Sequence, residues 1–260
     1  TWLIGFAEGD GSFFITSQNK TLGKHKITFL IGQQTKDIQV LKYIQDSLGF
    51  GRIEHSNKNM YRYIVTDIAH ISCLLLLFNG NIVMPKFHNR FCTILEKYNQ
   101  RRKNPIATLA ADLPAITIIN RLQKPALANA WLSGFTDAEG CFFCNYQMPS
   151  AKTRSGWKIV YSIGQKYKEN SLVLHHIAEI FNAGKVRSAK STGEDFWSFS
   201  ITNLKQNLTI INYFNRFTLK SKKLISFEKW VTVLMALNNK DHKDPVKQDQ
   251  LAAKAKTINQ

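Results

Sequence analysis

The sequence predicts an α+β fold made of two similar halves, each with a four-stranded antiparallel sheet. Two observations predict it. A stretch that begins at Trp2 and ends at Phe13 returns as residues Trp131 to Phe142, and Ile31-Gly32-Gln33 returns as Ile163-Gly164-Gln165. Each half also contains two pairs of segments in which apolar and polar residues alternate, as in β-hairpins. The repeat therefore indicates two subdomains built on one plan.

The spacing of the repeat also sets the expected domain boundaries. Proline residues interrupt the stretch between the halves, and the end of the chain is rich in lysine and lacks aromatic residues. We expect that end to be a loosely attached helix or tail that adds solubility and incidental phosphate contacts. The expected parts are an N-terminal subdomain at 1–104, a connecting segment at 105–130, a C-terminal subdomain at 131–237 and a basic polar tail at 238–260.

The two copies of the repeated stretch predict two short apolar helices. Small residues lie four positions apart in each, Gly5 and Gly9 in the first copy, which places them on one face and allows a second helix to approach closely. Each copy ends on an acid followed by glycine, which predicts a left-handed helix terminator. We therefore expect Asp10 and Glu139 side by side at the carboxyl ends of paired helices.

The rest of each half follows from periodicity and turn signals. In the first half we expect strands at 12–18 and 24–33, a helix at 36–48, a hairpin at 51–56 and 60–66, and helices at 67–78 and 85–100. In the second half we expect strands at 141–147 and 157–165, a helix at 169–181, a hairpin at 185–191 and 196–202, a helix capped by Asn203, and a helix at 221–237. Leu224, Phe227, Val231 and Leu234 should face inward on the last of these.

Composition and charge indicate a globular protein with a polyanionic partner. Hydrophobic residues make up 44% of the 260 residues, and 35 Lys and Arg against 18 Asp and Glu give a net charge of +17. Nucleic acid is the first candidate for the partner. A membrane is not expected, because no apolar run is long enough to span a bilayer. The sequence opens on the first motif at Thr1, so it displays no targeting segment and leaves the compartment open.

Four cysteines raise the possibility of a zinc site. Cys141 and Cys144 have the spacing of half a zinc knuckle, but there is no second pair, and residues three apart on a strand point to opposite faces. We therefore expect Cys73, Cys92, Cys141 and Cys144 to be buried free thiols.

The paired acids indicate a cation site. Two carboxylates beside two negative helix ends favour a cation, and hard oxygen ligands favour Mg²⁺. The alternative is a helix interface whose acids only cap a surface. One acid in each of two copies favours the metal site. Glu8 and Asp137 lie two residues before these acids and so do not share their face, so we expect them to have a structural role or to support the metal ligands, and not to be ligands themselves.

The repeated stretch also resembles a known family. Gly-Phe-Ala-Glu-Gly-Asp-Gly at residues 5–11 and Gly-Phe-Thr-Asp-Ala-Glu-Gly at residues 134–140 are similar to the signature of the LAGLIDADG homing endonucleases, in the single-chain form with two motifs. The resemblance covers nearly the whole chain. It implies two αββαββα halves that form a DNA-binding saddle and cut both strands across the minor groove. It also implies that two or more divalent ions are shared between Asp10 and Glu139, an Asp and a Glu that differ in reach, so equal cutting of the two strands should not be assumed.

The resemblance further implies polar groups around the metal ions. It places a Gln or a similar residue at the end of the second strand of each half, which matches Gln33 and Gln165. It places a Lys near the start of a late helix, which matches Lys223 in the second half and, less closely, Lys86 in the first. The alternative for these lysines is a solvated helix face or a phosphate contact.

The polar faces of the strands are the candidates for reading DNA. Arg and Lys suit guanine, Asn and Gln suit adenine, and a two-stranded ribbon can enter the major groove, although phosphate contacts usually outnumber base contacts. Because the halves differ at these positions, we expect a long, non-palindromic target. The candidates are Thr16, Gln18, Lys20, Lys24, Lys26, Arg52, Arg62, Asn145, Gln147, Lys158, Lys185 and Arg187, and Thr28 should continue the same polar surface.

These observations favour a monomeric, Mg²⁺-dependent, site-specific double-strand DNA endonuclease. Two alternatives stay open, an RNA-binding maturase that acts on intron RNA and a catalytically inactive DNA-binding repressor. The basic charge fits all three, and acids retained in both motifs favour the nuclease. The resemblance alone suggests an intron-encoded protein from an organelle such as the mitochondrion.

Overall fold

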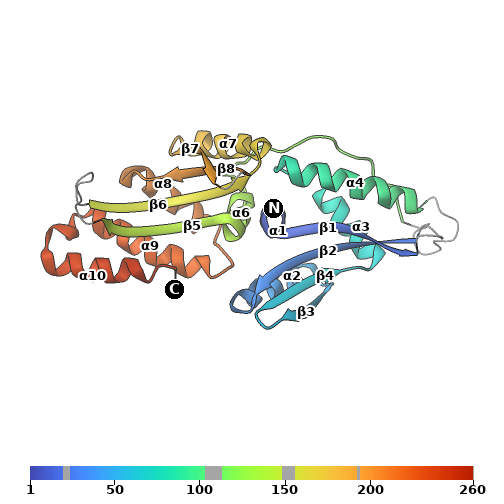
Figure 1. Cartoon of the computed structure of the whole chain (residues 1–260), viewed down its shortest axis with the longest axis horizontal. Helices are drawn as coiled ribbons and strands as arrows, with labels where there is room; N and C mark the ends of the chain where they lie inside the picture. The colour runs from blue at the N-terminus through green and yellow to red at the C-terminus, as the bar shows by residue number, and fades with distance from the viewer. Residues whose placement is uncertain (20–23, 103–112, 148–155, 192–193, 260) are drawn as a thin grey trace. The chain divides into compact units, whose positions relative to one another are not determined.

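The structure, a computed structural model, describes residues 1–19, 24–102, 113–147, 156–191 and 194–259. It divides into two compact units, Thr1–Lys124 and Pro125–Gln260, which we call unit 1 and unit 2. Figure 1 shows each unit as one sheet with its helices. No helix in the described residues is long and apolar enough to span a bilayer.

Unit 1 follows the expected order of helices and strands. Its elements are α1 (Trp2–Asp10), β1 (Gly11–Asn19), β2 (Lys24–Gln34), η1 (Thr35–Asp37), α2 (Ile38–Leu48), β3 (Arg52–Asn57), β4 (Met60–Val65), α3 (Ile68–Phe78) and α4 (Pro85–Arg102). The strands form an antiparallel sheet in the order β1-β2-β4-β3. One face of this sheet is buried against the helices through an aromatic cluster in which the rings of Phe29 and Phe78 both contact Phe13.

Unit 2 repeats the same order and extends it. Its elements are α6 (Trp131–Glu139), β5 (Gly140–Gln147), β6 (Gly156–Lys166), η2 (Lys168–Asn170), α7 (Ser171–Phe181), β7 (Lys185–Ser191), β8 (Glu194–Ile201), α8 (Leu204–Arg216), α9 (Lys223–Asn238), η3 (Asp241–Lys243) and α10 (Pro245–Lys256). The sheet order is β5-β6-β8-β7, antiparallel throughout. The α+β class and the two αββαββα halves are therefore confirmed, with α4, α9 and α10 added.

The predicted helix ends are confirmed where capping residues mark them. The side chain of Asp67 accepts hydrogen bonds from the backbone of α3, and Asn203 does the same for α8. Gly49 ends α2 in the left-handed conformation with φ of 73°.

The prediction that a left-handed glycine ends each motif helix is wrong. Gly11 and Gly140 follow the motif acids in extended conformations, with φ of −100° and −79°. A Cβ atom at Gly11 would lie 2.7 Å from the carbonyl oxygen of Ala7, and one at Gly140 would lie 2.8 Å from that of Thr136. Glycine is therefore needed because the strand leaves the helix too close to its last turn for any side chain.

The prediction of a loosely attached tail is also wrong. α10 packs against α9 and β5, and it buries Leu251 and Ala255. The amide of Asn259 donates to the carbonyl oxygen of Phe142 over 2.9 Å, which fixes the end of the tail to the sheet. Apolar residues at helical spacing within the lysine-rich stretch account for this attachment.

The inward face of α9 differs from the predicted one. Phe227 and Leu234 are buried as expected, but Leu224 and Val231 are only half-buried. The buried stripe continues instead through Trp230, Val233 and Leu237. The packing of α10 beside α9 covers this part of the helix, and the sequence pattern of α9 alone gives no sign of that neighbour.

Residues 113–124 of the connecting segment belong to unit 1, and residues 125–130 belong to unit 2. The side chain of Asn99 on α4 donates to the carbonyl oxygen of Ile116 and accepts from its backbone amide. The side chain of Asn79 donates to the carbonyl oxygen of Thr117 and accepts from the backbone amide of Ile119. Residues 105–112 of this segment, and residues 103 and 104 before it, lie outside the described residues.

The cysteines are free thiols, as predicted, but only one of them is buried. Cys144 is buried, Cys92 is half-buried, and Cys73 and Cys141 are exposed. Cys141 and Cys144 point to opposite faces of β5, which excludes a shared metal ion. The prediction of burial failed at Cys141 because it lies on the uncovered face of the sheet.

Candidate active site

The first motif acid lies at the end of α1 beside the predicted glutamine. Nε2 of Gln33 donates a hydrogen bond to Oδ2 of Asp10 over 2.6 Å, and both residues are half-buried. The register explains the contact, because Gly11 pairs with Ile31, two positions before Gln33 on β2. The sheet therefore holds an amide against the carboxylate at the helix end.

The second motif acid lies at the end of α6 near the predicted lysine. Nζ of Lys223 donates to the carbonyl oxygens of Thr136 and Ala138, over 3.2 and 2.8 Å. Ala138 precedes Glu139, so an ammonium group lies on the last turn of the motif helix. The carboxyl end of a helix is negatively polarised and favours such a cation.

The second glutamine is held differently from the first. Gln165 is 8% exposed, and its Oε1 atom accepts a hydrogen bond from Nδ2 of Asn170 over 3.2 Å. The same Asn170 amide also donates to the carbonyl oxygen of Lys166. The acceptor oxygen of Gln165 is thus engaged, which fixes the orientation of its amide plane.

Glu8 and Asp137 have the structural role that the sequence predicts. Oε1 of Glu8 accepts from the backbone amides of Val83 and Met84, both over 2.7 Å. The carboxylate of Asp137 accepts from the amides of Lys220 and Ser221 and from the hydroxyl of Ser221. Each motif helix therefore anchors the segment that leads into α4 or α9.

The anchored segments show that Lys86 and Lys223 occupy equivalent positions in the two units. Lys86 lies two residues after Met84, and Lys223 lies two residues after Ser221. Met84 and Ser221 are each bound by the carboxylate two positions before the motif acid. Lys86 and Lys223, both half-buried, are therefore equivalent residues near the starts of α4 and α9.

The donor set fits a hard divalent cation. Each unit offers one half-buried carboxylate at a helix end, where carbonyl oxygens of the last turn add negative polarisation. Within the described residues, no three His, Cys, Asp or Glu side chains cluster as a metal site. Asp10 in unit 1 or Glu139 in unit 2 therefore supplies only part of the ligand set that a divalent cation takes.

The predicted DNA-reading residues share the uncovered face of each sheet. In unit 2, the register pairs Asn145 with Lys158, and the same face carries exposed Gln147, Lys185 and Arg187. In unit 1, the register pairs Thr16 with Lys26, and Arg52 and Arg62 are exposed on the same face. All nine side chains thus lie opposite the helix-covered core.

Some of the predicted DNA-reading residues are paired or buried, and others lie where the structure does not describe the side chains. Arg52 forms an ion pair with Glu54 on the same strand, so part of its charge is already neutralised. Thr28 is on the predicted face but is 6% exposed, because it is a short side chain directly opposite Phe14. Lys20 lies outside the described residues, and Gln18 and Lys24 belong to strands whose side chains there are not described.

The chain matches the family model described as LAGLIDADG endonuclease over residues 3–98 and 132–234. These two regions cover more than half of the chain, one in each unit. The chain belongs to this family. Both matched regions include a motif helix, its sheet and the lysine-bearing helix that the motif anchors.

Individual relatives of this LAGLIDADG protein are intron-encoded. It is 34% identical over 94% of its length to "Probable intron-encoded endonuclease 4" of Neurospora crassa. It is 25% identical over 92% of its length to "Intron-encoded DNA endonuclease aI3" of Saccharomyces cerevisiae. The chain spans 41% and 63% of the lengths of these two relatives. A more distant match, 28% identical over 76% of the chain and 27% of the relative, is "Intron-encoded RNA maturase bI4" of Saccharomyces cerevisiae.

The fold also matches a solved structure of the LAGLIDADG enzyme I-SmaMI bound to uncleaved DNA in the presence of calcium ions. The TM-score is 0.80 at 17% sequence identity, over 100% of this chain and 98% of that one. At this identity the likeness establishes the fold.

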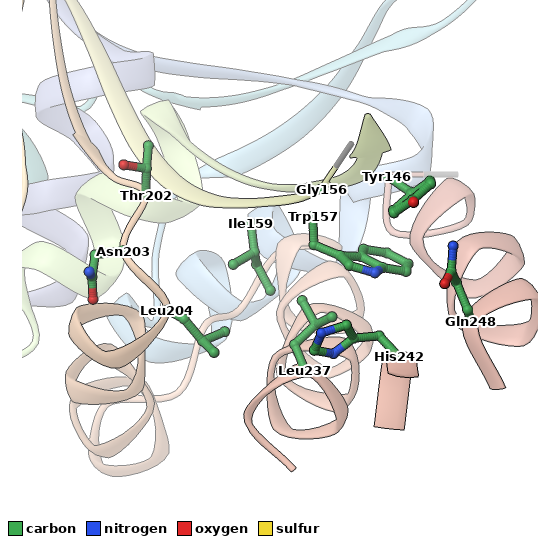
Figure 2. A pocket seen from close by; sticks show the side chains of 10 residues that line it. All are labelled: Tyr146, Gly156, Trp157, Ile159, Thr202, Asn203, Leu204, Leu237, His242 and Gln248. Carbon is green, nitrogen blue, oxygen red and sulfur yellow. The ribbon is translucent and has the colours of Figure 1, made fainter. Parts of the chain in front are cut away.

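Unit 2 of this LAGLIDADG protein also contains a pocket, of about 540 Å³, that is separate from the candidate site. Figure 2 shows side chains from β5, β6, α8, α9, η3 and α10 around it, with Trp157 and His242 among them. Its walls include the buried residues Ile159 and Leu237, so it lies on the helix-covered side of the sheet. Glu139 and Lys223 do not line it. The pocket therefore takes no part in the chemistry considered for the motif acids.

Two kinds of residue near the predicted site do not stand out from the sequence. Asn170, whose side chain donates to Gln165, lies within the predicted helix at 169–181, but the structure places it at the end of η2, directly before α7. Phe14 and Phe143 are exposed among the polar residues of the uncovered faces. Phe14 shares the face of Thr16 because residues two apart on a strand point the same way, but its apolar side chain keeps it out of the predicted polar set.

Proposed function

We propose that the chain is a site-specific, double-strand DNA endonuclease of the homing type. It cuts a long, non-palindromic target across the minor groove by metal-assisted hydrolysis of phosphodiester bonds. One observation carries the proposal: each unit ends a motif helix on a carboxylate, has a glutamine at the same register of its second strand, and has a lysine two residues after a residue that the motif helix anchors. Membership of the LAGLIDADG family supports the same reaction.

Asp10 and Glu139 would hold Mg²⁺ in this reaction. When bound, the metal ion polarises the phosphate and lowers the pKa of a bound water. We propose that α1 and α6 pair through their small residues, such as Gly5 and Gly134, which brings the two acids to one site. The carboxylates would then share two or more ions.

The other polar groups around the acids have distinct tasks. Gln33 and Gln165 orient the attacking water through their amides, and each amide is held by a hydrogen bond, to Asp10 or from Asn170. Lys86 and Lys223 place ammonium groups where negative charge grows on the phosphate and on the leaving oxygen. Asp10 and Glu139 differ by one methylene, so the two strands need not be cut at equal rates.

The uncovered sheet faces bind the DNA. Exposed Arg62 in unit 1, exposed Lys158 and Arg187 in unit 2, and half-buried Lys26 supply cations for phosphates and guanine edges. The side chains at matching positions of the two units differ, so the two halves of the target differ in sequence. A single chain carries both half-sites and would act as a monomer.

The names of the relatives support an intron-encoded origin, and mitochondrial location is part of the same proposal. A maturase that binds intron RNA is the second candidate, favoured by the similarity to a named RNA maturase. Paired metal-binding acids favour the nuclease, since RNA binding needs no such acids. A repressor without catalysis would bind DNA equally well with or without metal.

The test is cleavage of a randomised double-stranded DNA library with Mg²⁺, Ca²⁺ or EDTA, followed by sequencing of the cut ends. The proposal predicts recovery of one long asymmetric site that is cut with Mg²⁺ and spared with EDTA. Retention of duplex DNA without cutting would indicate the repressor. Preferential retention of structured RNA would indicate the maturase.

A further inference from the structure

Two phenylalanine side chains are exposed on the faces that carry the cationic residues. The chain has seventeen phenylalanines, all within the described residues, and only Phe14 and Phe143 are exposed, each to 39%. The other fifteen are buried or half-buried. Exposure of these two is therefore a property of their positions and does not reflect a general surplus of aromatic residues.

The two residues occupy equivalent positions. Each is the fourth residue after its motif acid, Phe14 after Asp10 and Phe143 after Glu139. Their strand partners, Thr28 and Val160, are both buried, at 6% and 7% exposure. The same arrangement is thus present in both units.

This recurrence distinguishes the pair from other exposed apolar side chains. Single exposed apolar residues are common on protein surfaces and need no explanation. Leu172 on α7, which is 62% exposed, is an example, because its counterpart on α2 is Gln39. An exposed phenylalanine at the same register of both sheets calls for a shared function.

The neighbours of each phenylalanine define the kind of ligand. Phe14 lies between the motif acid and the polar pair Thr16 and Lys26 on the uncovered face of its sheet. Phe143 lies likewise between Glu139 and the pair Asn145 and Lys158. An apolar ring in a row of polar and cationic side chains suits a base edge that has both polar groups and an apolar group.

We propose that Phe14 and Phe143 each contact the C5-methyl group of a thymine, one in each half of the DNA target. This inference rests on the proposed function. In the major groove the methyl group of thymine is the apolar feature of the base edges, and phenylalanine is among the side chains that contact it. Polar neighbours on the same strand read the adjoining bases, so the two rings add specificity that hydrogen bonds cannot supply.

The experiment uses the whole chain and the target recovered from the library. Each thymine of the target is replaced in turn by deoxyuridine, which lacks only the methyl group, and Kd is measured with Ca²⁺ in place of Mg²⁺. At one thymine in each half, the wild-type protein should bind about fourfold more weakly after replacement, the effect of one buried methyl group. In Phe14→Ala, replacement of thymine should no longer weaken binding in one half of the target but should still weaken it in the other half. In Phe143→Ala, the two halves should exchange these responses.

Two further variants act as controls. Phe14→Leu keeps an apolar side chain, so this variant should still bind the thymine target more tightly than the deoxyuridine target. Leu172→Ala should still lose affinity on replacement of the thymine in either half, because α7 does not belong to the sheet face. The inference is overturned if no thymine in one half responds to loss of its methyl group, or if the responses persist in the alanine variants. Failure to recover any specific target would overturn the proposed function instead.

Discussion

Gln33 and Asp10 are joined by a hydrogen bond of 2.6 Å, in which the glutamine amide donates to the motif carboxylate. In unit 2 the equivalent Gln165 accepts a hydrogen bond from Asn170. The two glutamines occupy the same register, yet one amide is held by the acid of its own motif and the other by the residue before α7. The two half-sites are therefore built from equivalent residues with different supports.

Removal of Asn170 should affect one DNA strand. In Asn170→Ala the amide of Gln165 loses a buried hydrogen bond worth about 1 kcal/mol, so the water that it orients is held less well. We expect cutting of one strand to slow about fivefold, which is seen as accumulation of nicked circles from a supercoiled plasmid that carries the target. Asn212→Ala, at an exposed position on α8, is the control. Equal slowing of both strands would contradict the role given to Asn170.

Loss of the Asp137 anchor should destabilise the fold. Asp137 is 4% exposed and accepts three hydrogen bonds, two of them from Ser221, so Asp137→Ala leaves buried donors without partners. The expected loss is about 3 kcal/mol in the free energy of unfolding, measured by urea denaturation. Glu179→Ala, at an exposed site, should change it by no more than about 0.5 kcal/mol. A similarly small effect of Asp137→Ala would show that the anchor is dispensable.

Neutralising Lys223 should impair cutting more than binding. Lys223→Met removes the ammonium group on the last turn of α6, while Lys222→Met removes an exposed charge from the preceding position. Both variants lose the same net charge, so their affinities for DNA should fall alike. Single-turnover cleavage should be at least about tenfold slower for Lys223→Met, as expected when a residue stabilises charge in the transition state. Identical cleavage rates for the two variants would show that Lys223 has no role in cleavage.

The thiols should differ in reactivity. Burial raises the pKa of the Cys144 thiol to about 12, whereas Cys73 is exposed. Only the thiolate reacts with alkylating reagents, so a raised pKa leaves Cys144 protonated at pH 8 and it becomes reactive only as the pH approaches 12. Peptide mass spectrometry after brief alkylation of the native protein should find Cys73 modified first and Cys144 last. Equal labelling of the two at pH 8 would contradict the burial of Cys144.

Patterns within single segments predicted most of the fold. The repeated motif, alternation along strands and capping residues such as Asp67 specify elements through local chemistry, and the structure has them close to the expected positions. The attachment of α10 was missed because its apolar residues are few and their partners lie on α9 and β5. The sequence also does not show why position 11 requires glycine. The carbonyl oxygen of Ala7 comes too close for a Cβ atom there only because of the way that the helix turns into the strand.

The candidate site was predicted less completely. The motif acids and Gln33 are readable from the repeat, and the structural role of Glu8 follows from helical spacing. The support of Gln165 by Asn170 depends on how β6 turns into η2 and α7, which no short pattern in the sequence specifies. The exposure of Phe143 likewise depends on which sheet face the helices cover.

The measurement that tests the central claim most directly is strand cleavage by Asp10→Asn and Glu139→Gln with Mg²⁺. Each substitution removes one negative charge from the proposed shared metal site and keeps the size of the side chain. The account predicts that each variant binds the target with nearly wild-type Kd and no longer makes double-strand breaks, and nicking by one of them would show that the two acids serve different strands. Double-strand cutting at the wild-type rate by either variant would contradict the paired-acid mechanism.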